Sequence, residues 1–199
     1  FERTTHGVQI RAETDAGTQV AISLDFCTTE IVRVRMKPEG LRVEESEYGD
    51  TGVLVSETWE PAPFLMSEAP DRLDLSTHMI RVEVARDPWC IRLLNSAGEL
   101  VCQEGEQSSL SGAFGPIAGS SGMGLGFVDD SENERIMVHE AFALAHDEDL
   151  YGLGEQFARI NRVGQRFELW ASDTPGISHH RTYKNVPLLW STRGYGLFV

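Results

Sequence analysis

The chain has 199 residues, enough for one good-sized domain and too few for a β-sandwich plus a complete α/β barrel. Apolar residues make up 41% of it and charged residues 24%, a balance that is typical of globular proteins and argues against disorder. Acidic residues outnumber basic ones by 31 to 17, and the net charge of −14 disfavours roles on nucleic acids or membrane surfaces, since both are themselves anionic.

Alternating apolar and polar residues mark three segments in the first half of the chain, at 20–26, 32–37 and 80–84. Such alternation puts one face on a core and the other in water, as half-buried antiparallel strands do. Short apolar runs also flank Asn95 to Gly98, so we expect a β-hairpin there. Together these patterns predict an all-β protein with many short strands, which favours a sandwich.

Three cysteines, Cys27, Cys90 and Cys102, lie far apart in strand-like segments and form no CxxC pair. This odd, sparse set predicts reduced, buried thiols in a cytoplasmic protein. The first residues, Phe1 to His6, hold no basic segment leading into an apolar core, so we expect no signal peptide. No apolar run approaches the roughly 18 residues of a membrane span.

The middle of the chain is less regular. Residues 104–125 are rich in Gly and Ser and predict a long surface loop. Residues 131–150 stay open between helix and strand, because 141–145 has good helix propensity while alternate apolar positions share strand parity. These positions are Ile136, Val138, Phe142 and Leu144, with Glu140 interrupting them.

The last fifty residues contain several turn and loop signals. Gly152 and Gly154 flank one residue, which permits a tight turn or a close approach of another segment. We expect a strand through Phe167 and Leu169, a loop over 171–180, and renewed strand character over 186–199 around a glycine kink at 194–196. Ligand contacts concentrate on loops that a scaffold holds in place, and this loop follows a strand.

Several blocks in this region form a recognisable series. They are Tyr151-Gly152-Leu153-Gly154-Glu155-Gln156-Phe157, Gly164-Gln165-Arg166-Phe167-Glu168-Leu169-Trp170, Asp173, Tyr183-Lys184-Asn185-Val186-Pro187 and Thr192-Arg193-Gly194-Tyr195-Gly196-Leu197-Phe198-Val199. In this order and spacing they resemble the amino-terminal domain of glycoside hydrolase family 31, the α-glucosidase and α-xylosidase family. The resemblance covers residues 18–199, and the 183–187 block is similar to the bacterial α-xylosidase-like branch.

The resemblance implies an antiparallel β-sandwich of the galactose-mutarotase-like type over residues 1–199, ending before its last strands, with a catalytic (β/α)8 barrel downstream. In the family the nucleophile and the general acid are aspartates of the barrel. The resemblance therefore implies no catalytic residue, metal or organic cofactor in this chain, which we expect to be inactive alone. An unpaired strand edge at the end of the chain would favour self-association into a homo-oligomer.

The resemblance also implies a substrate-binding loop. The family pattern W-N-x-D reads Trp170-Ala171-Ser172-Asp173 here, so the aspartate is present while Ala171 replaces the asparagine and removes an amide. Asp173 is expected near the bound sugar, with Thr174 and Trp170 as further substrate-binding candidates. From the residues alone, Asp173 also fits an Asx-turn or a solvated loop acid, and Trp170 also fits core packing.

Other candidates favour structural readings. His179 and His180 are adjacent, so on an extended chain they point to opposite sides and make a poor metal site. Glu155 follows Gly154 in a motif that the family places inside the sandwich, which favours a structural acid. Asp147 to Asp149, together with Glu140, read as a solvated acidic face. The pair Asp129 and Asp130 consists of loop neighbours, which do not face each other across a glycosidic bond.

The sequence thus predicts the amino-terminal domain of a retaining α-glycosidase whose partners are an α-linked oligosaccharide or glycoside and the enzyme's own barrel. Three alternatives remain. A stand-alone carbohydrate-binding module would show an exposed aromatic platform. A free aldose mutarotase would use a His acid and a Glu base in a cleft, and a purely structural interaction domain would bind no sugar.

Overall fold

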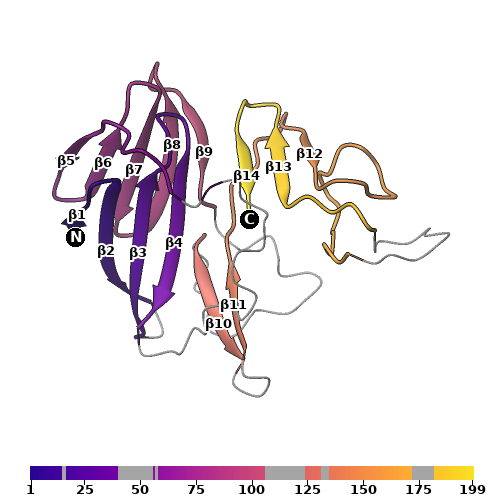
Figure 1. Ribbon diagram of the computed structural model, residues 1–199, viewed down its shortest axis with the longest axis horizontal. Helices are drawn as coiled ribbons and strands as arrows, with labels where there is room; N and C mark the ends of the chain where they lie inside the picture. The colour runs from indigo at the N-terminus through magenta and orange to yellow at the C-terminus, as the bar shows by residue number, and fades with distance from the viewer. Residues whose placement is uncertain (15–16, 40–55, 57, 106–123, 131–134, 172–181) are drawn as a thin grey trace. The chain divides into compact units, whose positions relative to one another are not determined.

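The computed structural model describes residues 1–14, 17–39, 56, 58–105, 124–130, 135–171 and 182–199. Every regular element within these residues is a β-strand, and all pairings between the strands are antiparallel (Figure 1). Nothing helical in the described part of the chain has the length and apolar character of a membrane span. The backbone contacts divide the chain into two compact units, Phe1–Ala143 and Leu144–Val199.

The first unit contains a four-stranded meander. Its strands are β1 (Glu2–Arg3), β2 (Gly7–Glu13), β3 (Gln19–Phe26) and β4 (Val32–Pro38), paired in chain order. The predicted alternation at 20–26 is confirmed, because every second residue of β3 from Val20 to Phe26 is buried. The predicted strand at 32–37 is β4.

The second sheet of this unit is a five-stranded meander. Its strands are β5 (Leu65–Glu68), β6 (Arg72–Ser76), β7 (Ile80–Arg86), β8 (Trp89–Asn95) and β9 (Leu100–Gln103), again paired in chain order. The hairpin predicted at Asn95 to Gly98 joins β8 to β9. Asn95 Oδ1 accepts the N–H groups of Ala97 and Glu99 at 3.0 and 2.9 Å, while Gly98 takes the φ of +82° that the turn requires.

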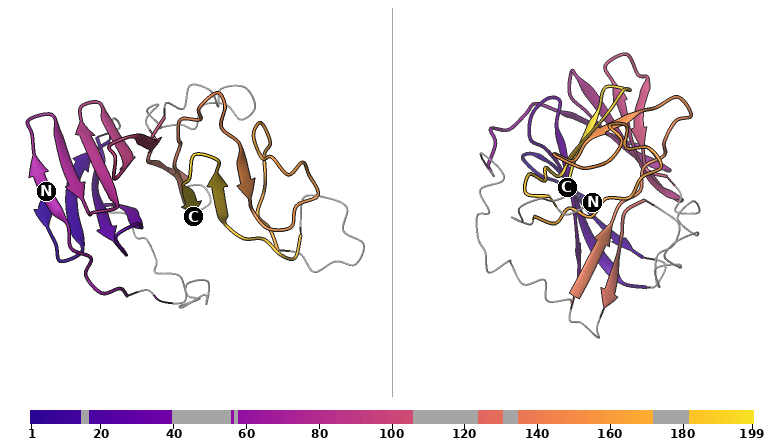
Figure 2. Two further views of the ribbon diagram at one scale, coloured as in Figure 1. Left: turned by 90° about the horizontal axis from the view of Figure 1, so that it is seen from above. Right: turned by 90° about the vertical axis from the view of Figure 1, so that its right-hand side faces the viewer.

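The two sheets pack face to face, with β2 to β4 over β6 to β9 (Figures 1 and 2). Their shared core is made of buried residues from both layers, together with Ala62 from the segment before β5: Val8, Leu24, Phe26, Ala62, Leu73, Leu75, Val82, Val84 and Ile91. The rings of Phe26 and Phe64 meet with centroids 5.5 Å apart. Each large apolar side chain buried here contributes about 1.5–3 kcal/mol. This packing confirms the predicted all-β sandwich.

The segment left open between helix and strand contains a strand. β10 (Gly126–Asp130) pairs with β11 (Arg135–His139) in a two-stranded sheet. Residues 141–145 are extended in spite of their helix propensity, because the edge of β9 supplies partners: Ala143 N–H donates to Gln103 O at 2.9 Å, and Phe142 bridges Glu104. Most of the predicted loop at 104–125 lies outside the described residues.

The second unit holds a three-stranded sheet of β12 (Leu150–Gly152), β13 (Leu188–Ser191) and β14 (Gly196–Phe198), in that order. The kink predicted at 194–196 is the turn between β13 and β14, where Gly194 has φ +86°. The Tyr151 and Trp190 rings stack across β12 and β13 with centroids 4.7 Å apart. Leu188, Trp190 and Phe198 of this sheet are exposed apolar residues.

The cysteines behave as the sequence predicts. All three are free thiols, with Cys27 and Cys102 buried and Cys90 half-buried in β8. Burial raises the pKa of both Cys27 and Cys90, so these thiols are less readily ionised than an exposed cysteine. They therefore pack as small apolar side chains within the first unit.

Candidate functional site

A turn of unusual backbone geometry begins the candidate site in the second unit. Gly152, Leu153 and Gly154 have φ values of +115°, +68° and +74°, so three consecutive residues lie in the region that favours glycine. The turn brings the chain against the 184–188 segment. Leu153 N–H donates to Leu188 O, and Glu155 N–H donates to Lys184 O, both at 2.9 Å.

The two glycines are required by this close approach. A Cβ added at Gly154 would lie 2.0 Å from Lys184 O, and one at Gly152 would lie 2.3 Å from Leu188 O. Both distances are far inside van der Waals contact. The Gly152-Leu153-Gly154 motif therefore forms a tight turn and also permits a close approach of the 184–188 segment, both of which its glycines suggested.

Directly after the turn, a network of side-chain amides joins three segments. Gln156 Nε2 donates to Asn185 Oδ1 at 2.7 Å and to Leu153 O at 3.1 Å. Asn185 Oδ1 also accepts from the Thr182 hydroxyl at 3.0 Å, and Asn185 Nδ2 donates to Thr182 O at 3.0 Å. Thr182 is only 2% exposed. We call Gln156, Asn185 and Thr182 the amide clamp.

The amide clamp holds one end of the predicted sugar-binding loop. Thr182 forms a parallel bridge with Ala171, so the residues on either side of 172–181 lie next to each other. Asp173 and Thr174, the two principal sugar-binding candidates, lie outside the described residues, as do His179 and His180.

Trp170, the third candidate, is 54% exposed, and its backbone N–H donates to Glu168 O at 3.1 Å. The alternative in which Trp170 packs into the core is therefore wrong for the described structure. The strand predicted through Phe167 and Leu169 is also wrong, because residues 166–170 belong to no strand. Instead, the Arg162 guanidinium lies 4.9 Å from the centroid of the Phe167 ring, so Phe167 packs on a charged side chain rather than into a ladder.

Residues 153–165 form an irregular but well-bonded loop. Arg162 N–H donates to Leu150 O at 2.7 Å, and its Nε donates to Gly152 O at 3.1 Å. Asn161 bonds the Asp149 carboxylate through Nδ2 and accepts the N–H of Val163 at 3.0 Å. These contacts connect the loop to β12, beside the glycine turn.

The acidic run at 147–149 is not a solvated face throughout. Glu148 is 4% exposed and accepts hydrogen bonds from the Ser191 hydroxyl and from Ala145 N–H. Burial alone would raise the pKa of this carboxyl, but the hydrogen bonds from Ser191, Tyr195 and Ala145 outweigh it and lower the pKa. The prediction is thus wrong for Glu148, because its partners come from β13 and the following turn, which charge patterning cannot locate.

Glu155 lies at the surface rather than inside a sandwich. Its side chain is 55% exposed, and a carboxylate oxygen is 3.5 Å from Lys184 Nζ. An exposed pair of this kind contributes little to stability. The backbone of residue 155 takes part in the turn, whereas its side chain does not.

Gln156 and Asn185 both lie in recognisable sequence blocks, but nothing in the sequence indicates a role for either side chain. They are separated by 29 positions, so neither periodicity nor spacing brings them together. The useful signal was the pair of glycines, which indicates a close approach without saying what approaches. Thr182 lies just beyond the predicted loop, and no sequence signal marks it as a buried residue.

Comparison with known proteins assigns the chain to a family. Residues 21–199 match the sequence model of the glycosyl hydrolase 31 N-terminal galactose mutarotase-like domain. The chain belongs to this family. Its antiparallel sandwich and the absence of helices among the described residues agree with the galactose-mutarotase-like fold that the resemblance implied.

Curated relatives of this family 31 domain include two α-xylosidases. XylQ from Lactiplantibacillus pentosus is 39% identical over 62 residues, which are 31% of this chain and 8% of that protein. An α-xylosidase from Emericella nidulans is 34% identical over 95 residues, or 42% of this chain and 12% of that protein. The matched regions are thus a small part of each relative.

Solved structures with the same fold cover almost the whole chain. A family 31 α-xylosidase from Xanthomonas citri has a TM-score of 0.68 at 20% identity, covering 100% of this chain and 18% of its own. A family 31 dextranase from Flavobacterium johnsoniae, complexed with glucose, has a TM-score of 0.66 at 20% identity, covering 97% of this chain and 22% of its own.

Another cluster of titratable groups lies in the first unit of this family 31 domain. Glu104 is buried, and its Oε2 accepts Ile91 N–H at 2.6 Å. Glu140 is an exposed residue, but one of its carboxylate oxygens and the Glu104 side chain both lie close to Gly124. A Cβ added at Gly124 would lie 2.6 Å from Glu140 Oε1 and 2.7 Å from Glu104 Cβ. Burial, followed by the charge of Glu104, raises the pKa of Glu140 to about 8. Burial also raises the pKa of Glu104.

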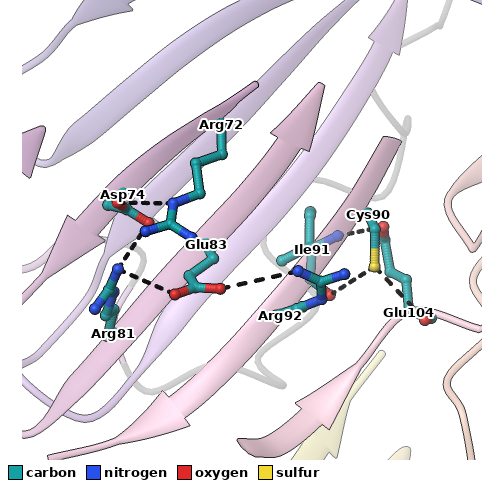
Figure 3. A network of polar contacts seen from close by, with 8 residues as sticks. All are labelled: Arg72, Asp74, Arg81, Glu83, Cys90, Ile91, Arg92 and Glu104. Atoms are coloured by element: carbon teal, nitrogen blue, oxygen red, sulfur yellow. Dashed lines mark hydrogen bonds and ion pairs between the residues drawn. The ribbon is translucent and has the colours of Figure 1, made fainter. Parts of the chain in front are cut away.

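A ladder of charges crosses β6, β7 and β8 on the same unit (Figure 3). Asp74 and Glu83 lie directly opposite each other, which would be unfavourable for two carboxylates. Arg81 bridges them, with one guanidinium nitrogen 3.2 Å from Asp74 and 3.0 Å from Glu83. Arg72 and Arg92 extend the ladder on either side. Because these charges are paired with one another, we interpret the ladder as stabilising the sheet rather than as a binding site.

The prediction that Asp129 and Asp130 lie in a loop is wrong. Asp129 and Asp130 are neighbours in β10, opposite Ile136 and Arg135, rather than in a loop. Among the described residues, no three His, Cys, Asp or Glu side chains come together as metal ligands.

Proposed function

We propose that this domain is the non-catalytic amino-terminal part of a retaining α-glycosidase, an α-glucosidase or α-xylosidase that hydrolyses O-glycosyl bonds. It supplies a loop to the rim of the substrate site and supports a catalytic (β/α)8 barrel. In a retaining mechanism one carboxylate forms the glycosyl-enzyme and a second carboxylic acid protonates the leaving oxygen. The barrel provides both groups, and no metal or organic cofactor takes part.

The observation that carries the proposal is the fixed base of the 172–181 segment. The Ala171–Thr182 bridge and the amide clamp hold both flanks of the segment that contains Asp173 and Thr174. Ligand contacts concentrate on loops that a scaffold holds in place. A carboxylate accepts strong charged hydrogen bonds from neighbouring sugar hydroxyls, and Trp170, three positions earlier in the chain, is exposed and could offer its aromatic face to a sugar ring.

The partners follow from the same reasoning. The saccharide is an α-linked oligosaccharide or glycoside, in line with relatives named as α-xylosidases and with a dextranase solved with isomaltotriose. The exposed apolar side chains of Leu188, Trp190 and Phe198 suit a covered protein interface, with the barrel or with a second copy. The three free thiols fit a reducing cytoplasm.

The test compares Asp173→Asn with a matched control inside the complete polypeptide that carries this chain. We expect Asp173→Asn to lower kcat/KM by about 10- to 100-fold, because a charged hydrogen bond to the sugar is lost. Asp147→Asn removes one exposed carboxylate from the same unit and should leave kcat/KM unchanged. Equal values for wild type and Asp173→Asn, or hydrolysis by residues 1–199 alone, would refute the proposal.

The exposure of Trp170 also favours a second candidate, a stand-alone carbohydrate-binding module. Titration of residues 1–199 with xylose, glucose and isomaltotriose separates the two. The rim-loop proposal predicts weak or no binding, since most of the contacts belong to the barrel. Saturable binding that Trp170→Ala abolishes would instead establish the module.

A further inference from the structure

The first unit ends in a short stretch that is added to the edge of β9. Ala143 N–H donates to Gln103 O, and Gly105 N–H donates to Ala141 O, both at 2.9 Å. Residues 141–143 are the last of this unit, and the chain passes into the second unit directly after them. An addition of only three residues can open without unfolding the sandwich, because a local opening costs less free energy than global unfolding.

Glu104 is the buried acid of this attachment. It is bridged to Phe142, and only 5% of it is exposed. Its Oε2 accepts Ile91 N–H at 2.6 Å (Figure 3), but within the described part of the chain its Oε1 has no hydrogen-bond partner. A buried carboxylate oxygen without a donor is costly when it is charged, so this position favours the protonated acid.

Glu140 belongs to the same attachment and directly precedes residue 141. Its Oε1 accepts Ala141 N–H at 3.1 Å, and Ala141 N–H also donates to Gly124 O at 3.1 Å. A Cβ added at Gly124 would meet both this Oε1 and the Glu104 side chain, so the two acids share the space that the glycine leaves free. Two carboxylates in one such space repel each other when both are charged.

The other titratable or charged side chains around the pair are Cys90 and Arg92 of β8 and His139 of β11. Arg92 forms its ion pair with Glu83 in the ladder of charges, whereas no described basic side chain pairs with Glu104 or Glu140. A bound proton is therefore what removes the repulsion between the two acids.

We propose that Glu104 and Glu140 form a proton-operated latch on residues 141–143. With one proton bound, the pair keeps this stretch on the edge of β9. When the proton is lost, the two carboxylates repel and the stretch opens while the sandwich stays folded. This property of the fold is independent of the proposed sugar-binding role.

The direction of the pH dependence follows from the proton balance. Burial, followed by the charge of Glu104, raises the pKa of Glu140 from its usual 4.5 to about 8. The closed latch therefore binds a proton that the open latch releases. Closure is strongest below about pH 5, weakens as the pH rises, and levels off above about pH 8.

Hydrogen exchange in the complete polypeptide that carries this chain tests the latch, followed in peptides that cover 103–105 and 141–143. After correction for the intrinsic exchange rate, we expect the protection of the Gly105, Ala141 and Ala143 amides to fall about tenfold or more between about pH 5.5 and about pH 8. Their exchange should depend little on urea, as a local opening does, whereas the β3 amides should show the steep dependence of global unfolding.

Three variants define the groups involved. Glu140→Gln imitates the protonated acid and should keep protection high across this pH range. Glu30→Gln is the matched control, since it removes an exposed carboxylate between β3 and β4 and should keep the wild-type trend. Glu104→Gln removes the repelling charge while its amide oxygen can still accept Ile91 N–H, so the pH at which protection levels off should move down.

Several outcomes would overturn the latch. One is protection that does not change with pH, or that falls in step with the β3 amides at the same urea dependence. A trend that survives in Glu140→Gln would also overturn it, because the proton would then belong to His139 or Cys90. If Glu140→Gln fails to fold, an unmoved levelling-off in Glu104→Gln would decide against the latch.

Discussion

Substitution of Gly154 by alanine tests the geometry on which the site is built. Gly154 has φ +74°, where a side chain costs about 1–2 kcal/mol. An added Cβ would also stand 2.0 Å from Lys184 O, so the two segments must separate. Overpacking costs about 1–3 kcal/mol, and loss of the Glu155 N–H to Lys184 O bond about 1 kcal/mol more. We therefore expect a loss of about 4 kcal/mol in the second unit.

Gly164 provides the matched control for this experiment. It has φ +69°, close to that of Gly154, but an added Cβ would meet no atom within 4 Å. Gly164→Ala should therefore cost only the backbone contribution, about 1–2 kcal/mol. The difference between the two variants isolates the close approach from the conformational preference of glycine.

Urea unfolding and amide hydrogen exchange measure this difference. The Leu153 and Glu155 amides, which donate to Leu188 O and Lys184 O, report the turn directly. We expect their protection to fall about 30-fold or more further in Gly154→Ala than in Gly164→Ala, corresponding to about 2 kcal/mol. Equal protection in the two variants would show that the 184–188 segment does not lie against Gly154.

Three further changes test other parts of the molecule. Leu24→Ala empties a fully buried core position and should lower the free energy of unfolding by about 2–5 kcal/mol in urea, whereas a loss below about 1 kcal/mol would contradict the shared core. The raised pKa of Glu140 means that the folded state binds more protons than the unfolded state, so stability should fall as the pH rises from about 5 through about 8. Glu140→Gln should flatten this trend in thermal melts, and an unchanged pH profile would contradict the raised pKa of Glu140. Arg81→Met leaves two facing carboxylates without their bridge and should cost about 1 kcal/mol at low salt, with a smaller loss at high salt, where the repulsion between the carboxylates is screened.

The sandwich was predictable because its signals are local. β3 alternates so regularly that Val20 and Phe26 are assigned to the core from sequence, and Asn95 with Gly98 specifies the hairpin between β8 and β9. Each of these signals lies within one element and its immediate turn. Meander connectivity then follows, since consecutive antiparallel strands pair with their neighbours.

The errors share one physical cause. Phe167 and Leu169 have strand parity, but a strand also needs a ladder partner, and within the described part of the chain neither residue is paired in a strand. Glu148 sits in an acidic run, but Ser191, 43 positions away, supplies a hydroxyl that makes its burial tolerable. Local patterns state a preference, whereas distant residues decide whether that preference is met.

The amide clamp bears on the departure of this chain from the family pattern. Ala171 carries no side-chain amide where the pattern has asparagine, and its backbone is bridged to Thr182. Thr182 is in turn bonded to the Asn185 amide through both its hydroxyl and its carbonyl. An amide at 171 is therefore not needed to keep the two ends together.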